Sequence, residues 1–171
     1  MNVNGIETER RFLIRRPSPE LLAGLTADAI EQIYIDSDSG GTARVRARSR
    51  DGLVTYTHTV KKRLSAISAR EDEREISAEE FELLAKTQEK GTSPIRKTRY
   101  LLPYRGLIFE IDVYAEWRGV AIMEVELPAE TAEVTTPPGI DIIKEVSGDH
   151  RLSNHSLSRR FPDEEELTAE I

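Results

Sequence analysis

Apolar and polar residues alternate with a period of two along most of the first 127 residues, which is the pattern of β-strands with one buried face. The alternation predicts eight strands, over residues 6–14, 31–36, 42–50, 53–63, 69–76, 95–102, 107–114 and 120–127. Asp51-Gly52 separates the third and fourth of these and is a strong hairpin signal. Several connections of hairpin length favour antiparallel pairing.

A few segments have helical spacing instead. The predicted helices cover residues 20–30, the stretch from Ser77 to Gly91, and residues 129–133, 140–146 and 154–160. Ser77 and Glu80 form a capping box at the start of the second helix, and Gly91 is typical of a helix end. We expect one domain over residues 1–162, followed by a frayed acidic tail over residues 163–171.

Carboxylates lie two residues apart on three of the predicted strands, so each pair shares a strand face at a spacing of roughly 7 Å. The pairs are Glu7 with Glu9, Glu110 with Asp112, and Glu124 with Glu126. Like charges at this spacing repel unless a cation lies between them. One such pair is compatible with a solvated strand surface, but Glu is a poor strand former, and three pairs favour a divalent ion such as Mg²⁺ or Mn²⁺.

Basic residues show the same spacing. Arg44 shares a face with Arg46, Lys97 shares a face with Arg99, and Lys61 lies on the face of two threonines. Arg and Lys are phosphate-binding groups. A sheet closed into a barrel would bring the basic and acidic rows together inside. We therefore expect an α+β, mainly antiparallel β fold: an eight-stranded closed β-tunnel with a few flanking helices, whose interior binds phosphates and metal ions.

Composition narrows the class of protein. The 171 residues suit one domain, and the net charge of −7 disfavours a general nucleic-acid binder, which needs a basic surface. Without cysteine there are no disulfides and no thiolate metal site. No apolar run approaches the length of a membrane span. The expectation is a cytoplasmic protein with neither a membrane nor a nucleic acid as partner.

Several short motifs resemble those of one known family. They are Glu7-Thr8-Glu9-Arg10-Arg11, Arg44-Val45-Arg46, Thr59-Val60-Lys61, Glu73-Arg74-Glu75-Ile76, Lys97-Thr98-Arg99-Tyr100, Phe109-Glu110-Ile111-Asp112, Glu124-Val125-Glu126, and Gly148-Asp149-His150-Arg151 with Asn154. Each motif is weak alone, but their order and spacing over roughly 145 residues resemble the CYTH superfamily, the triphosphate tunnel metalloenzymes.

The resemblance implies an enzyme, a divalent-metal-dependent triphosphatase, and a role for each motif, which we state as expectations. It assigns the binding of two Mg²⁺ or Mn²⁺ ions to Glu7, Glu9, Asp112, Glu124 and Glu126. It assigns phosphate binding to Arg11, Arg44, Arg46, Lys61, Lys97, Arg99 and Arg151, and supporting roles to Glu73, Glu75 and Glu110. The catalytic set is Glu7, Glu9, Arg11, Glu124 and Glu126. In the first motif Arg11 replaces the family's lysine, and an arginine clamps phosphate but does not give up its proton.

The leading hypothesis is metal-dependent hydrolysis of a small-molecule triphosphate, with inorganic triphosphate first and thiamine triphosphate also open. The alternatives are a class IV-type adenylyl cyclase that makes cyclic AMP from ATP and a non-catalytic polyphosphate- or nucleotide-binding module. A cyclase needs a base pocket, for which Trp117, Tyr114 and Tyr34 are candidate stacking groups. A homodimer is left open.

Overall fold

The computed structural model of the chain describes residues 4–38 and 40–169. Its strands are β1 (Ile6–Arg15), β2 (Thr26–Ile35), β3 (Thr42–Arg50), β4 (Leu53–Arg63), β5 (Ser68–Ile76), β6 (Ile95–Tyr104), β7 (Leu107–Tyr114), β8 (Val120–Glu126) and β9 (Ile142–Glu145). Its helices are α1 (Pro19–Ala23), α2 (Ala78–Ala85), α3 (Asn154–Leu157) and α4 (Glu164–Thr168), with a 3₁₀ turn η1 (His150–Leu152).

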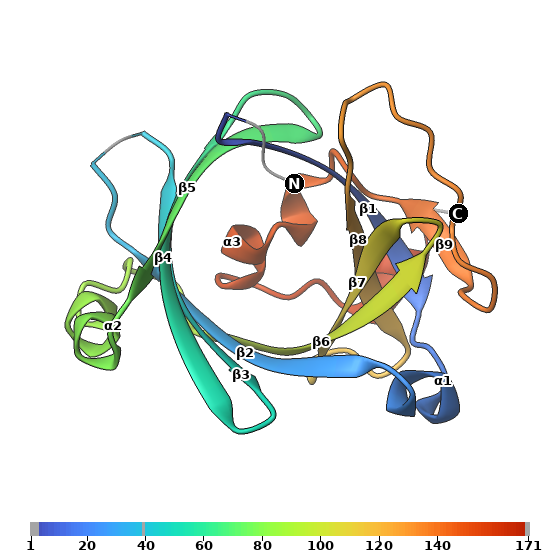
Figure 1. The fold of residues 1–171 in the computed structure, drawn as a ribbon, viewed down its shortest axis with the longest axis horizontal. Helices are drawn as coiled ribbons and strands as arrows, with labels where there is room; N and C mark the ends of the chain where they lie inside the picture. The colour runs from blue at the N-terminus through green and yellow to red at the C-terminus, as the bar shows by residue number, and fades with distance from the viewer. Residues whose placement is uncertain (1–3, 39, 170–171) are drawn as a thin grey trace.

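Eight strands close into an antiparallel barrel, which confirms the predicted fold class (Figure 1). Around the ring the order is β5-β4-β3-β2-β6-β7-β8-β1, and β9 is an extra strand that pairs with β1. The ring is completed between β1 and β5 through the residue pairs Ile6 with Arg70, Glu7 with Ala69, and Thr8 with Ser68. Residues Glu9 to Arg15 of the same strand pair with β8.

Apolar side chains cover the outside of the barrel on two sides. On one side, Phe81 and Leu84 of α2 pack on a cluster from β2 and β3 that includes Ile33 and Val45. On the other side, α1 and the segment 128–141 pack on the outward faces of β1, β7 and β8. Because each strand alternates, burial of these outward faces turns the charged rows toward the interior.

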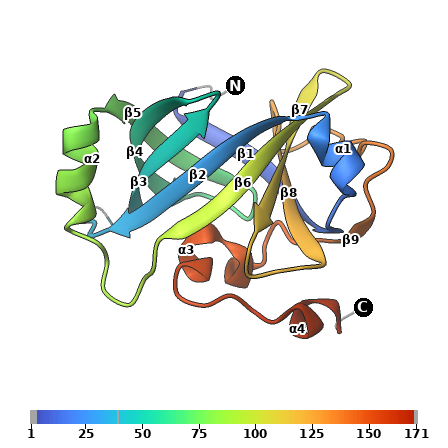
Figure 2. The ribbon, with the colours of Figure 1, turned by 90° about the horizontal axis from the view of Figure 1, so that it is seen from below.

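A third apolar cluster fills one end of the barrel. Inward-facing Leu13 and Ile122 pack there against Leu152, Leu157 and the other buried residues of the C-terminal segment. Figure 2 shows α3 and α4 lying across this end. Trp117 belongs to the same cluster and donates from Nε1 to the backbone oxygen of Pro162 at 2.8 Å, which ties the segment to the barrel. The polar interior is therefore confined to the other part of the barrel.

Some predicted elements are wrong. Residues 26–30, predicted as helix, form the start of β2, and residues 140–146 include β9 rather than a helix. Residues 129–133 are not helical, and α2 ends at Ala85 instead of continuing to Gly91. In each misread segment, pairing with a distant strand or packing on the barrel overrides the local helical spacing.

The prediction of a frayed tail is also wrong over the described residues, because α4 forms there and Leu167 is fully buried. Residues 170 and 171 of the predicted tail, and residues 1–3 and 39 of the predicted domain, lie outside the described residues. Within residues 4–38 and 40–169, none of the helices has the length and apolar character needed to cross a membrane.

Candidate functional site

The barrel holds a cavity of about 650 Å³ with a wall rich in charged side chains. The structure brings most of the predicted site residues to this wall: Glu7, Glu9, Arg11, Arg44, Arg46, Lys61, Glu73, Arg99, Glu110, Glu124 and Glu126. They come from seven strands, and their shared orientation follows from the period-two alternation. The antiparallel register also places opposite charges side by side across the strands, for example Lys61 beside Glu71.

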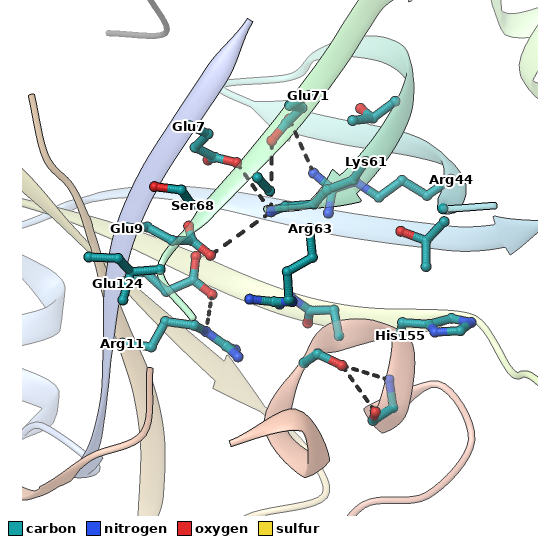
Figure 3. A pocket seen from close by; sticks show the side chains of 18 of the residues that line it. Glu7, Glu9, Arg11, Arg44, Lys61, Arg63, Ser68, Glu71, Glu124 and His155 are labelled. Carbon is teal, nitrogen blue, oxygen red and sulfur yellow. Dashed lines mark hydrogen bonds and ion pairs between the residues drawn. The ribbon is translucent and has the colours of Figure 1, made fainter. Parts of the chain in front are cut away.

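Lys61 is the centre of one group of charges (Figure 3). Its Nζ lies 3.1 Å from Glu7 Oε2, 3.8 Å from Glu71 Oε2 and 4.0 Å from Glu9 Oε1. Arg44 Nη2 lies 3.8 Å from Glu71 Oε1. Three carboxylates therefore share Lys61 and one arginine, so this group has more negative than positive charge near β1.

The pKa values of two of these carboxyl groups are raised by burial and by the neighbouring carboxylates. The pKa of Glu7 rises from 4.5 to about 7, first because the group is buried and then because Glu71 contacts it. The pKa of Glu9 also rises to about 7, first through burial and then through the charge of Glu124. Lys61 acts in the opposite direction in both cases without offsetting these effects. An additional cation at this place would favour the ionised forms.

A second group of charges surrounds Arg99. Arg99 Nε and Nη2 donate to Asp112 Oδ1 and Oδ2 at 2.7 and 2.9 Å, and Arg99 Nη1 pairs with Glu110. Lys97 Nζ donates to Asp112 Oδ2 at 2.7 Å. Arg99 Nη2 lies 3.6 Å from Glu124 Oε2, while Glu124 Oε1 accepts a hydrogen bond of 3.0 Å from Arg11 Nε. In this group three basic side chains lie beside three carboxylates, and burial followed by the charge of Arg99 lowers the pKa of Lys97 to about 7.

Three arginines that line the cavity have donors without an acidic partner. Arg46 donates from Nε and Nη2 to the neutral Oε1 of Gln32 at 3.1 and 3.0 Å. Burial, and then the nearby charges of Arg44 and Arg99, lower the pKa of Arg46 to about 10. Arg11 Nη2 and Arg44 Nε are buried and have no hydrogen-bond partner within residues 4–38 and 40–169. Buried donors of this kind are costly unless a ligand satisfies them, so the residues fit an anion such as a phosphate.

The carboxylates have the donor chemistry for a divalent cation. Oε2 of Glu7 and Oε2 of Glu71 are buried and accept no hydrogen bond from the described part of the chain, although Lys61 is near both. Carboxylate oxygens are the ligands that Mg²⁺ and Mn²⁺ prefer. No three acidic or histidine side chains among the described residues are already gathered as metal ligands. The fit therefore rests on the chemistry of the oxygens and on their crowding.

Four of the predicted site residues do not line the cavity. The side chains of Lys97 and Asp112 are fully buried behind its wall. Glu75 is exposed, and Arg151 pairs with Asp149 at 2.8 Å between Nη2 and Oδ2. The prediction that aromatic rings stack a base is wrong for Trp117 and Tyr114, which are buried in the apolar end of the barrel, whereas Tyr34 does line the cavity.

Sequence reasoning also missed residues of the wall. Glu71 shares the alternating face of Glu73 on β5, so the same period-two pattern would have found it. Arg63 at the end of β4 shares the face of Lys61 in the same way. His155 lines the cavity from α3, and no pattern in the sequence indicates that this short helix lies across the barrel.

Comparisons with known proteins agree with the fold. A family model described as the CYTH domain matches residues 5–161. The solved structure titled as the inorganic triphosphatase NE1496 is similar over 92% of this chain and 97% of that chain, with 28% identity and a TM-score of 0.56. The PH1819 protein from Pyrococcus horikoshii OT3 is similar over 72% of this chain and 80% of that chain, with 19% identity and a TM-score of 0.55. No curated protein matches the chain.

Proposed function

The chain belongs to the CYTH family, and from this premise we propose that it hydrolyses the terminal phosphoryl group of a triphosphate, with inorganic triphosphate as the preferred substrate. The observation that carries the proposal is the pair of buried, unsatisfied donors, Arg11 Nη2 and Arg44 Nε, at a cavity that also contains crowded carboxylates. The similarity to an inorganic triphosphatase at 28% identity supports the choice of substrate.

The residues of the wall divide into two roles. Arg11, Arg44 and Arg46 bind phosphate oxygens, since these residues line the cavity, their donors are unsatisfied or bonded to a neutral oxygen, and a guanidinium can bind phosphate through two donors. Their charge stabilises the negative charge of the transferred phosphoryl group. The enclosed barrel strengthens these interactions because it limits access of bulk water.

Glu7, Glu9, Glu124 and Glu126 are the residues that would hold Mg²⁺ or Mn²⁺. When bound, such an ion supplies charge neutralisation on the phosphate oxygens and activation of the attacking water. Arg11 stays protonated, so it binds the phosphate and does not take a proton from the attacking water. Lys61 lies between Glu7 and Glu9 and holds their side chains beside the phosphate-binding arginines.

The test is release of phosphate from inorganic triphosphate in the presence of Mg²⁺ or Mn²⁺. We expect turnover by the wild-type protein and a loss of about 100-fold or more in kcat for Glu124→Gln, because the change removes a charge aimed at the reacting centre. Glu82→Gln, on the exposed side of α2, is the matched control and should keep full activity. Absence of turnover in the wild type, or full turnover in Glu124→Gln, would contradict the proposal.

The same assay with ATP separates hydrolysis from cyclisation. ADP with phosphate is the expected product pair, since Tyr34 is the one candidate stacking ring of the three that lines the cavity. Cyclic AMP with pyrophosphate would identify a cyclase instead. Tight binding of triphosphate by calorimetry, without any product after long incubation, would identify a binding module.

A further inference from the structure

A second pocket lies on the outside of the barrel, where α1 follows the end of β1. It has a volume of about 680 Å³ and is lined by residues of the segment 15–23, by Tyr100 of β6, and by Arg118 and Gly119 of the loop between β7 and β8. Tyr100 packs on the outer apolar cluster that includes Leu22 of α1, and Figure 1 shows α1 outside the ring of strands. Within the described part of the chain this outer pocket shares no lining residue with the charged cavity, so the two are separate.

The wall of the outer pocket carries positive charge. Its basic residues are Arg15, Arg16 and Arg118, and none of the described residues that line it is Asp or Glu. Arg15 Nε lies 3.3 Å from Asp141 Oδ2, but the two side chains are 63% and 69% exposed, so water weakens this ion pair. Arg16 and Arg118 are exposed and have no ion pair or side-chain hydrogen bond within residues 4–38 and 40–169. Two guanidinium groups are therefore available to an anion.

Backbone contacts hold these two arginines next to each other. The N–H of Arg16 donates to the backbone oxygen of Gly119 at 2.9 Å, which places Arg16 beside the loop that carries Arg118. The carboxylate of Glu164 lies near Arg118, but its two oxygens accept hydrogen bonds from the backbone N–H groups of Arg118 and Gly119 at 3.0 and 2.6 Å. The three guanidinium charges of the pocket exceed the two carboxylate charges beside it, those of Asp141 and Glu164.

The rest of the wall is apolar. Pro17, Leu22 and the partly buried ring of Tyr100 line the pocket together. An aromatic ring beside arginines suits a ligand that joins a flat apolar group to an anion. The volume lies within the range of about 300–1,000 Å³ that is usual for small-molecule sites. An inorganic anion would leave the apolar part of the wall without a contact.

We propose that the outer pocket binds a nucleoside monophosphate. Arg16 and Arg118 bind the phosphate oxygens, and the base lies against Tyr100 and Leu22. A phosphate monoester carries a charge of about −1.5 to −2 at pH 7, which two guanidinium groups match. The inference goes beyond the proposed function, because the pocket uses none of the residues that we assign to the triphosphate.

The first test is a titration of the full chain with AMP in EDTA, followed through the backbone ¹⁵N–¹H NMR signals. We expect the signals of Tyr100 and Gly119 to shift, while those of Thr59 and Lys61, which line the charged cavity, stay in place. Adenosine and inorganic phosphate, each titrated alone, should bind at least tenfold more weakly than AMP, because each of them contacts only one part of the wall.

The second test is calorimetry of AMP binding to variants. Arg16→Gln combined with Arg118→Gln should weaken binding at least tenfold, and the fold should be kept because both side chains are exposed. Arg70→Gln combined with Arg96→Gln removes two exposed arginines that do not line the pocket, so binding should stay within about twofold of wild type. Tyr100→Leu keeps an apolar side chain without the ring and should weaken AMP binding at least fivefold, with no effect on inorganic phosphate.

Shifts confined to residues of the charged cavity would overturn the proposal, as would AMP binding that the double variant of Arg16 and Arg118 retains. The absence of AMP binding at millimolar concentration would overturn it as well. Inorganic phosphate bound as tightly as AMP, together with full AMP binding by Tyr100→Leu, would reveal a simple anion site and refute the assignment to a nucleotide. Each of these results stands whether or not the protein hydrolyses triphosphate.

Discussion

Substitution of Glu9 by Gln should stabilise the protein at alkaline pH while it removes a residue of the site. Glu9 lies near Lys61. The pKa of Glu9 rises from 4.5 to about 7, chiefly through burial and then through the charge of Glu124. Between these two pH values the folded protein binds more protons at this group than the unfolded chain does. Stability therefore falls as the pH rises through this window.

The magnitude follows from the size of the pKa rise. One pKa unit corresponds to about 1.4 kcal/mol, so full ionisation of Glu9 costs the folded state on the order of 3 kcal/mol. The side chain is 23% exposed, and solvent reduces this cost, so we expect about 2 kcal/mol. Below pH 4.5 the group is protonated in both states and the cost disappears.

The assay is urea unfolding of wild type and Glu9→Gln in EDTA across pH 4 to pH 8. The two proteins should have nearly equal free energies of unfolding at pH 4, and the variant should be about 2 kcal/mol more stable at pH 8. Glu82→Gln, on the exposed face of α2, is the control for the loss of a charge and should track the wild type. A difference that does not vary with pH, or a variant that is less stable at pH 8, would refute the reasoning.

Three further predictions concern the metal, the core and one turn. Mn²⁺ added at pH 8 should raise the melting temperature of the wild type more than that of Glu9→Gln, since a cation beside the carboxylates favours their ionised forms. Equal shifts in melting temperature would contradict metal binding by Glu9. Leu167→Ala should cost about 2–5 kcal/mol in urea unfolding because Leu167 is fully buried, whereas Leu83→Ala, 63% exposed, should cost far less; equal losses would mean that α4 does not pack on the barrel. Gly41→Ala should lower the melting temperature, because a Cβ there would overlap the backbone oxygen of Lys61, whereas Gly148→Ala meets its nearest atom at 4.0 Å and should be tolerated.

The charged rows could be predicted because they depend on alternation alone. Arg44 and Arg46 are both on the cavity wall, as their spacing on one strand requires, and so are Glu7 and Glu9. The order of motifs also indicated the family, which the CYTH match over residues 5–161 confirms. These features are local in sequence or repeat at fixed intervals, so one chain is enough to find them.

The rest depends on contacts between distant segments. Residues 26–30 continue the helical spacing of Leu21, Leu22 and Leu25, yet they pair with β6 in the sheet. The segment 140–146 has helical spacing as well, but its pairing with Phe12 and Leu13 of β1 makes it a strand. Neither pairing partner can be read from the segment itself.

Prediction of the site from the sequence is limited in the same way. Alternation places Lys97 and Asp112 on inward faces, but it does not show that they meet across β6 and β7. Once they pair, neither side chain remains available at the cavity. Which charges neutralise one another is decided by strand register, and register depends on the whole barrel.

The junction between β1 and β5 has a mechanical consequence. This junction contains three residue pairs, from Ile6 with Arg70 to Thr8 with Ser68. The pairing of β5 with β4 is longer and runs from Tyr56 with Ile76 to Arg63 with Ala69. Lys61 bridges this short junction, since it contacts Glu7 on one side and Glu71 on the other. The β1–β5 pairing can therefore open locally while the other strands stay paired. A ligand in the cavity would stabilise this pairing and slow amide hydrogen exchange selectively at residues 6–8 and 68–70.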